Sequence, residues 1–309
     1  MARIRSLLVG VDVYQRPEIP RLHGCVNDVA LVRRLLKEYF GVPNEDIRVV
    51  VNERATRDAI VHRLRTMIRD AREGDILVFY YSGHGSQIRD RDGDELSDNL
   101  DELICPYDMD WDRRTYILDD DLVDLFAEAR AGILMEAFFD CCFFGAGARD
   151  LGSKLARRGV REDVRYIPPP FDIASRSEGD DMSLVDHGFR ESTLFAEQNV
   201  LWSATAEGEE AVEDVFDGRT HGVFTYCGCR FIEENVARQW FGEYSRNQLL
   251  DDVRAYMRSL GYSQSAELGA SRPLRVIGPF EPVFERPAWM RARRSTRGWT
   301  RRPRVHPHV

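Results

Sequence analysis

Two stretches decide the fold, ILVFYYSGHG at residues 76–85 and ILMEAFFDCC at residues 133–142. Each is an apolar run of strand length that ends in a reactive side chain, His84 in the first and Cys142 in the second. Such runs are typical of buried parallel strands, and ligands bind beyond the carboxyl ends of these strands. The sequence therefore predicts an imidazole and a thiol at the same edge of one sheet.

A thiol beside an imidazole is a nucleophile with its base, the pair that covalent acyl transfer needs. Taken singly, His84 and Cys142 also fit a core-edge histidine and a buried cysteine, and it is their pairing that favours chemistry. The backbone N–H groups of Gly85 and Cys142 are the predicted donors to an oxyanion. Cys141 is the rival nucleophile, but side chains alternate along a strand, so the two thiols should point in opposite directions.

Composition bounds the class of protein. The 309 residues allow one large or two modest domains, and 43% of them are apolar. The apolar run at residues 6–13 is too short for a membrane span or a secretory signal, so we expect no membrane partner and a cytoplasmic location. The six cysteines lack the spacing of a disulfide framework or a Cys-x-x-Cys zinc site, which favours reduced thiols.

Charge is unevenly distributed along the chain. The formal net charge is −9, yet the tail from Arg286 holds eight arginines and no acidic residue. We therefore expect no nucleic-acid partner for the body of the protein, while the basic tail leaves a local anionic partner open. The tail at residues 286–309 has no apolar periodicity and is predicted to be disordered.

Strand and helix patterns alternate, which predicts an α/β fold with a mostly parallel sheet and helices on both faces. Thr56 should cap one helix, and Ser245 with Gln248 should form a capping box for another. Residues 89–101 are expected to be a loop, and residues 146–192, with three consecutive prolines, an irregular connection. The expected strands are 7–13, 47–51, 76–81, 133–139, 199–204 and 274–277, and the expected helices are 27–40, 57–72, 121–130, 222–235 and 245–260.

With these motifs in order, the chain resembles the caspase-like cysteine peptidases, and within them the bacterial metacaspase and orthocaspase group. The matching segments are YSGHG at 81–85, DCC at 140–142 and HGVFTY at 221–226. The resemblance implies the caspase-hemoglobinase fold, with a six-stranded sheet, in a single peptidase domain over residues 1–285. It divides that domain into a large-subunit-like part (1–145), an inter-subunit linker (146–192) and a small-subunit-like part (193–285).

One departure from the family pattern favours a second hypothesis. Family members usually have His-Ser-Gly after the cysteine, and this chain has Phe143-Phe144-Gly145. A catalytically silent caspase-like module, acting as a binding or regulatory scaffold, is therefore the alternative to a cysteine endopeptidase. Retention of His84 and Cys142 favours the enzyme. A metal-dependent hydrolase lacks histidine ligands at useful spacing, and no Gly-x-Gly-x-x-Gly turn indicates a dinucleotide.

The resemblance also implies a specificity pocket. Cys25, Asp28, Ser82 and Asp140 match the positions that, in metacaspases, receive the side chain before the scissile bond. Two carboxylates there would pair with arginine, or with lysine second, and would repel aspartate. Protein or peptide substrates with such a residue are therefore the expected partners. Asp28 has an alternative role as a helix N-cap, which Asn27 could serve equally well.

The sequence does not decide between calcium binding and a solvated acidic loop. Residues 90–95 resemble an EF-hand loop, but their glycine comes too early for the required turn. The resemblance to calcium-responsive metacaspases points instead to Asp101, Asp119 and Asp120, with a fourth ligand near Asp150 displaced by one residue. A solvated acidic loop, with Asp119 as a helix cap, is the alternative. The Cys–His chemistry itself requires no cofactor.

Processing is predicted in the linker, which we expect to be exposed and poorly ordered. Polar segments of that kind are preferred sites of nicking. An Arg-directed peptidase would be expected to cut itself there, and an upstream activator is compatible with the same architecture. The candidate positions are Arg157, Arg158, Arg161 and Arg165, with Arg176 further along.

Overall fold

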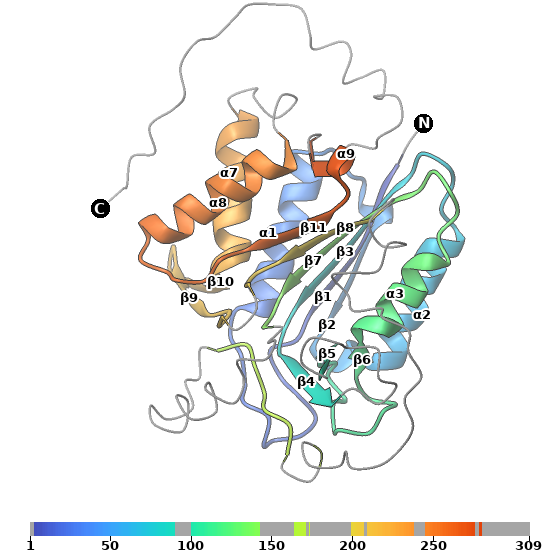
Figure 1. The fold of residues 1–309 in the computed structure, drawn as a ribbon, viewed down its shortest axis with the longest axis vertical. Helices are drawn as coiled ribbons and strands as arrows, with labels where there is room; N and C mark the ends of the chain where they lie inside the picture. The colour runs from blue at the N-terminus through green and yellow to red at the C-terminus, as the bar shows by residue number, and fades with distance from the viewer. Residues whose placement is uncertain are drawn as a thin grey trace, which may run out of the picture.

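A six-stranded sheet forms the centre of the computed structural model, with helices on both of its faces (Figure 1). The structure describes residues 3–89, 100–142, 164–170, 173, 199–206, 209–237, 245–275 and 278–279. Strand order is β11-β8-β7-β3-β1-β2, and every neighbouring pair is parallel except β11 with β8. The strands are β1 (Ile4–Gly10), β2 (Ile47–Val51), β3 (Ile76–Ser82), β7 (Leu134–Asp140), β8 (Asn199–Ser203) and β11 (Glu267–Ala270).

Two helical layers bury the two faces of this sheet. One face is covered by α1 (Cys25–Glu38), α7 (Val223–Ala237) and α8 (Arg246–Ser259), and the other by α2 (Arg57–Arg69) and α3 (Asp119–Ala127) (Figure 1). Every residue of β3 is buried, which explains its unbroken apolar sequence, because a central parallel strand has no solvent face. The fold predicted from the alternating patterns is thus confirmed.

Smaller elements surround the carboxyl edge of the sheet. A three-stranded antiparallel sheet contains β4 (Gly85–Arg89), β5 (Leu100–Ile104) and β6 (Ile117–Leu118), and a hairpin contains β9 (Glu213–Phe216) and β10 (Arg219–Gly222). The short helical turns are η1 (Asn44–Asp46), η2 (Asn52–Arg54) and α9 (Arg272–Arg275). Both β4 and the hairpin lie where the central strands end, so they can line a site there.

The helix boundaries follow local chemistry. Thr56 caps α2 by accepting a hydrogen bond from the Ala59 N–H at 3.3 Å, and Ser245 and Gln248 form the capping box of α8. Both caps were predicted. Asp119 is not a cap, because Leu118 holds the N-cap position of α3 and its N–H donates to Asp121 instead.

Four expectations about elements were wrong. The last strand is β11 rather than 274–277, where Leu274 lies in a helical turn. β1 ends at Gly10, three residues before the expected end. Asp101, expected in a loop, lies in β5, which pairs with β4. The linker contains a buried extended piece, residues 164–167, rather than an exposed chain throughout. The tail at 286–309 lies outside the described residues.

The two decisive stretches end side by side. β3 and β7 are paired neighbours, with Ser82 opposite Asp140 at their carboxyl ends. His84 follows β3 by two residues, and Cys142 follows β7 by two residues. The predicted placement of both at one sheet edge is therefore correct. No helix in the described ranges is both long and apolar enough to cross a membrane.

Candidate active site

The two adjacent cysteines face opposite sides of the sheet. Cys141 belongs to the apolar cluster beneath α2 and α3, and Cys142 to the cluster beneath α1 and α7. The Cys142 sulfur accepts a hydrogen bond from the Ala211 N–H at 2.9 Å, and both thiols are buried. Alternation along the strand therefore separates them as predicted.

His84 is held from three sides. Its Nε2 lies 2.8 Å from the carbonyl oxygen of Pro20, its backbone N–H donates to the Tyr14 hydroxyl at 2.8 Å, and its carbonyl accepts from the Tyr81 hydroxyl at 2.7 Å. A carbonyl only accepts, so the proton of a neutral imidazole resides on Nε2 and leaves Nδ1 basic. The buried Nδ1 has no hydrogen-bond partner among the described residues.

The predicted specificity pocket holds a side chain of this same protein, Arg165 from the linker. Its guanidinium is 0% exposed and lies 2.8 Å from Asp28 Oδ2 and 3.0 Å from Asp140 Oδ1. Ser82 Oγ accepts a further hydrogen bond from Nη1 at 2.9 Å and donates its own to Asp28 at 3.0 Å. Three of the four residues assigned to the pocket therefore contact one arginine.

The backbone of Arg165 lies across the end of β7. Its carbonyl oxygen accepts hydrogen bonds from the Gly85 N–H at 3.0 Å and the Cys142 N–H at 3.3 Å, the two donors expected to serve an oxyanion. Its own N–H donates to the Ala211 carbonyl at 3.0 Å, and Val164 forms an antiparallel bridge with Val212. Arg165 thus contacts the pocket, both predicted donors and the strand beside the thiol.

Asp28 is fixed by the first turn of α1 and by the hairpin. Gly24 holds the N-cap position, so the alternative role of Asp28 as a cap is wrong. Its oxygens accept from the Gly222 N–H at 3.1 Å, and Oδ1 lies 3.0 Å from Nδ1 of His221. A Cβ at Gly222 would overlap both the Asp140 carboxylate and the Arg165 guanidinium, so the ion pair fits only against a glycine at this position.

Cys25, the fourth predicted pocket residue, is buried at the first residue of α1, where its N–H donates to Asp12 at 2.8 Å. Burial raises the pKa of its thiol strongly, and the Arg165 cation opposes that rise. Cys25 therefore lies close enough to the guanidinium to be affected by its charge.

A third carboxylate in the pocket was missed by sequence reasoning. Glu213 Oε2 lies 3.4 Å from Arg165 Nη2, and the carboxylate also accepts from the backbone N–H groups of His23 at 2.7 Å and Gly24 at 3.0 Å. Glu213 therefore ties the hairpin to the loop that precedes α1 and that supplies the Pro20 carbonyl to His84. No local motif marks it, since its partners are about 190 residues away.

Burial controls the protonation of the reactive pair. It raises the pKa of Cys142 well above its ordinary value, despite the hydrogen bond from Ala211. It lowers the pKa of His84 to about 4, and the Arg165 cation contributes to that lowering. With Arg165 in place, the pair is therefore a neutral thiol and a neutral imidazole near pH 7. Burial also raises the pKa of Asp140, against the effect of the Arg165 cation.

The residues considered for calcium lie apart from this pocket. Asp101 is on β5, and Asp119 and Asp120 begin α3. Among the described residues, no group of three or more His, Cys, Asp or Glu side chains is arranged to hold a metal ion. Calcium binding stays a prediction. Asp150, Phe143, Phe144 and the candidate cleavage positions Arg157, Arg158, Arg161 and Arg176 lie outside the described residues.

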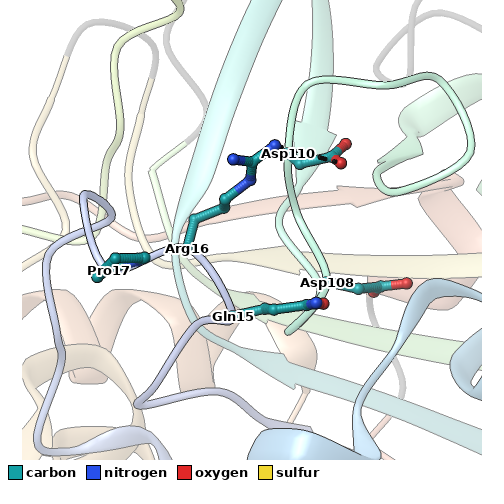
Figure 2. Close-up of a pocket in the computed structure, with 5 residues that line it drawn as sticks. All are labelled: Gln15, Arg16, Pro17, Asp108 and Asp110. Carbon is teal, nitrogen blue, oxygen red and sulfur yellow. Dashed lines mark ion pairs between the residues drawn. The ribbon is translucent and has the colours of Figure 1, made fainter.

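A separate polar pocket lies on the loops that precede α1 and follow β5. It is lined by Gln15, Arg16, Pro17, Asp108 and Asp110, and its arginine points toward Asp110, 3.7 Å away (Figure 2). Gln15 is anchored by its N–H, which donates to the Tyr107 carbonyl at 2.8 Å. None of the groups that contact Arg165 lines this pocket.

Comparisons with known proteins point to one family of peptidases. A family model for the metacaspase, peptidase C14 domain matches residues 4–150. Metacaspase-1 of Sclerotinia sclerotiorum is 26% identical over 306 residues, which cover 90% of this chain and 68% of that protein. Metacaspase-1 of Schizosaccharomyces pombe is 28% identical over 300 residues, covering 87% and 68%. The bacterial origin stays a prediction.

Two solved structures share the fold. Protein GSU0716 of Geobacter sulfurreducens has a TM-score of 0.64 at 19% identity, covering 91% of this chain and 99% of its own. Caspase-1 of Spodoptera frugiperda has a TM-score of 0.53 at 13% identity, covering 91% and 90%. Residues 4–150 thus match a metacaspase, peptidase C14 domain, and the chain is similar over most of its length to metacaspases, which supports a caspase-like cysteine endopeptidase.

Proposed function

We propose that this protein cleaves polypeptides after arginine, with lysine second, and that its own Arg165–Tyr166 bond is its first substrate. The observation that carries the proposal is the position of one residue. The Arg165 side chain fills a pocket of three carboxylates, while its carbonyl oxygen meets the N–H groups of Gly85 and Cys142. A specificity pocket and a pair of oxyanion donors are thus engaged by the same residue.

In this proposal Cys142 is the nucleophile and His84 its base. Nδ1 of His84 takes the thiol proton as the sulfur attacks the Arg165 carbonyl carbon, and the two N–H donors stabilise the oxyanion that forms. Collapse breaks the bond to the Tyr166 nitrogen, which receives the proton from His84. Water, deprotonated by His84, then releases the Arg165 carboxylate and restores the thiol.

Arginine selectivity follows from where the carboxylates lie. Asp140 approaches Nη1, whereas Asp28 and Glu213 approach Nη2, so the planar guanidinium is contacted on both terminal nitrogens. A lysine ammonium is a single point charge and cannot occupy both positions. An aspartate would add a fourth negative charge to the pocket and should be rejected.

The seated segment also keeps other substrates out. Arg165 is 0% exposed and Cys142 is buried, so an external polypeptide reaches the thiol only after residues 164–167 move. In this proposal, self-cleavage after Arg165 therefore precedes cleavage of other proteins. Cleavage after Arg157, Arg158 or Arg161 would leave residues 164–167 connected only to the chain that leads to β8. It would be a second way for these residues to leave the site.

The test uses purified full-length protein beside its Cys142→Ala variant, with and without calcium. Mass spectrometry should find a fragment that ends at Arg165 in the active protein alone. Peptides that end in Arg should then be hydrolysed, Lys peptides more slowly and Asp peptides not at all. An intact chain with no Arg-peptide hydrolysis in either condition would overturn the proposal. A calcium requirement in the active sample would establish the ion as an activator.

A further inference from the structure

The segment that carries Arg165 continues past the bond proposed to be cleaved, and its next residues are held as firmly. The Ile167 N–H donates to the Gly85 carbonyl at 3.1 Å, and the Ile167 carbonyl accepts from Ser86 Oγ at 2.6 Å. Tyr166 forms a parallel bridge with Gly85 between these contacts. The start of β4 therefore binds the chain on the far side of the Arg165–Tyr166 bond.

The side chains on either side of that bond enter different layers of the protein. Val164 joins the apolar cluster beneath α1 and α7, and Ile167 joins the one beneath α2 and α3, which also contains Ile88 and Leu103. Ile167 is 3% exposed, so it is buried as deeply as a core residue. The segment thus crosses the carboxyl edge of the sheet and is anchored on both faces.

Ser86 meets the segment with a buried hydroxyl. It is 0% exposed, and the hydrogen bond that its Oγ makes goes to Ile167. The three residues that follow Ile167 are prolines, which have no N–H to donate and favour an extended conformation at the residue before them. The backbone bonds to β4 therefore end at Ile167, and its conformation suits them.

Resting on the proposed function, we propose that the site selects substrates by the second residue after the scissile bond. It accepts a buried aliphatic side chain there, and Ser86 is the residue that positions the chain. The substrate class is a polypeptide with arginine before the cleaved bond and isoleucine or valine two residues after it. The intervening residue, Tyr166, packs against the apolar cluster beneath α1 and α7 and is kept constant in the test peptides.

This recognition should act on turnover as well as on binding. Gly85 donates its N–H to the Arg165 carbonyl and accepts at its own carbonyl from Ile167, so one residue contacts both sides of the bond. Binding of Ile167 therefore fixes the orientation of an oxyanion donor. Loss of the Ile167 N–H should lower kcat and not only raise KM, because a donor that is misplaced weakens transition-state stabilisation.

The experiment compares substrates on the self-processed protein. One is a coumarin amide that ends at arginine and has no residue after it; the others are quenched peptides containing Val-Arg-Tyr-Ile, Val-Arg-Tyr-Asp or Val-Arg-Tyr-(N-methyl)Ile. For each peptide, kcat/KM is divided by the value for the coumarin amide. This ratio should be roughly tenfold higher for the Ile peptide than for either of the other two peptides, the effect of one hydrogen bond or one buried aliphatic group. For the N-methyl peptide, part of the loss in kcat/KM should be a lower kcat.

Ser86→Ala should reduce the ratio of Ile-peptide to coumarin-amide hydrolysis by roughly fivefold, as expected for one lost hydrogen bond. Ser6→Ala is the matched control, because Ser6 is a buried serine of β1 whose hydroxyl has no hydrogen-bond partner among the described residues. Its ratio should equal that of the unmodified protein.

The outcomes separate the inference from the function on which it rests. If neither coumarin amide nor peptides are hydrolysed, the proposed function fails. If the coumarin amide is hydrolysed and the three peptides are cut at equal rates, the recognition of Ile167 is overturned while the peptidase stands. Because the peptide comparison uses the unmodified protein, it decides the matter even if Ser86→Ala does not fold.

Discussion

Two arginines with no exposed surface mark opposite ends of the same strand, and they are built differently. Arg246, the first residue of α8, pairs with Glu136 of β7 through Nε at 3.0 Å and Nη2 at 2.9 Å, and donates from Nη1 to the Leu274 carbonyl at 3.0 Å. Arg165 meets Asp140 of β7 together with Asp28 and Glu213, and its Nε has no partner among the described residues.

The difference distinguishes a structural ion pair from the proposed binding pocket. Among the described residues, Arg246 forms its ion pair with Glu136, and the Trp202 indole N–H also donates to Glu136 at 3.0 Å, so charge and hydrogen bonds are satisfied locally. Around Arg165, three carboxylates of the described residues face one guanidinium. An excess of fixed negative charge is unfavourable for a permanent pair and suitable for a guanidinium that arrives and leaves.

The largest expected effect comes from removing the proposed nucleophile. Cys142→Ala should abolish both self-cleavage and Arg-peptide hydrolysis. The chain then stays uncut, and the Arg165 side chain should remain bound in the pocket. His84→Ala should slow both by about 10²–10⁴-fold, the usual cost of a lost acid–base group. Fragment analysis and peptide assays measure these rates. Cys141→Ala is the control and should retain most activity; a dead Cys141→Ala with a live Cys142→Ala would reverse the assignment.

The next largest effect is on the free energy of unfolding, which should fall by different amounts when the two arginines are replaced. In the Cys142→Ala background, which keeps the chain uncut, Arg246→Met should cost about 3–5 kcal/mol, because it leaves Glu136 charged and buried. Arg165→Met should cost less, since the segment can leave and water can then reach the carboxylates. Urea denaturation at pH 7 gives both values. Equal losses would mean that the pocket is as closed to water as the core.

A smaller effect tests guanidinium geometry. Arg165→Lys keeps the charge but cannot contact both sides of the pocket, so self-cleavage after residue 165 should slow by roughly tenfold, equivalent to one charge-assisted hydrogen bond. The time course of the fragment, followed by mass spectrometry, measures the rate. Arg246→Lys loses the two-nitrogen contact with Glu136, which lies near the opposite end of β7 from Asp140, and this variant should cleave at the unmodified rate. If self-cleavage slowed equally in both variants, the slowing would come from lost stability and not from guanidinium geometry.

The smallest expected effect is a difference in pH dependence between self-cleavage and peptide hydrolysis by the processed protein. Burial lowers the pKa of His84 to about 4 while Arg165 is seated. The neutral base therefore persists above pH 4 and is lost as the pH falls through 4, so self-cleavage should keep its rate well below pH 6. If residues 164–167 leave the site after the proposed cleavage, water reaches His84, so the acid limb of kcat/KM for the processed protein should lie at higher pH, nearer the ordinary pKa of histidine. Coincident acid limbs would contradict this.

Local chemistry determined how much could be predicted from the sequence. The caps at Thr56 and Ser245 and the buried strands β3 and β7 are encoded within a few residues, and all were predicted correctly. β11 was missed because its sequence, ELGA, has little strand propensity and is held by pairing with β8. The expected strand at 274–277 was wrong for the same reason, since tertiary contacts place Leu274 in a helical turn.

At the site, residue types were accessible to sequence reasoning and backbone positions were not. Asp28, Ser82 and Asp140 were identified from motifs, and they meet at one guanidinium. Glu213 has no motif, and Pro20 acts through a carbonyl that every residue possesses. Nothing local distinguishes Arg165 from the other linker arginines. Its place is set by Val212, Ala211 and Gly85, which lie on either side of it in space.

If Arg165 is cleaved as proposed, its covalent connection to the site has a kinetic consequence. Arg165 lies 25 residues along the chain from Asp140, so its effective concentration at the pocket is of millimolar order or higher. A micromolar protein substrate cannot compete with it before the chain is cut. Processing in cis should then be first order, with a half-time that does not change on dilution, and the uncut protein would be equally latent at any cellular abundance.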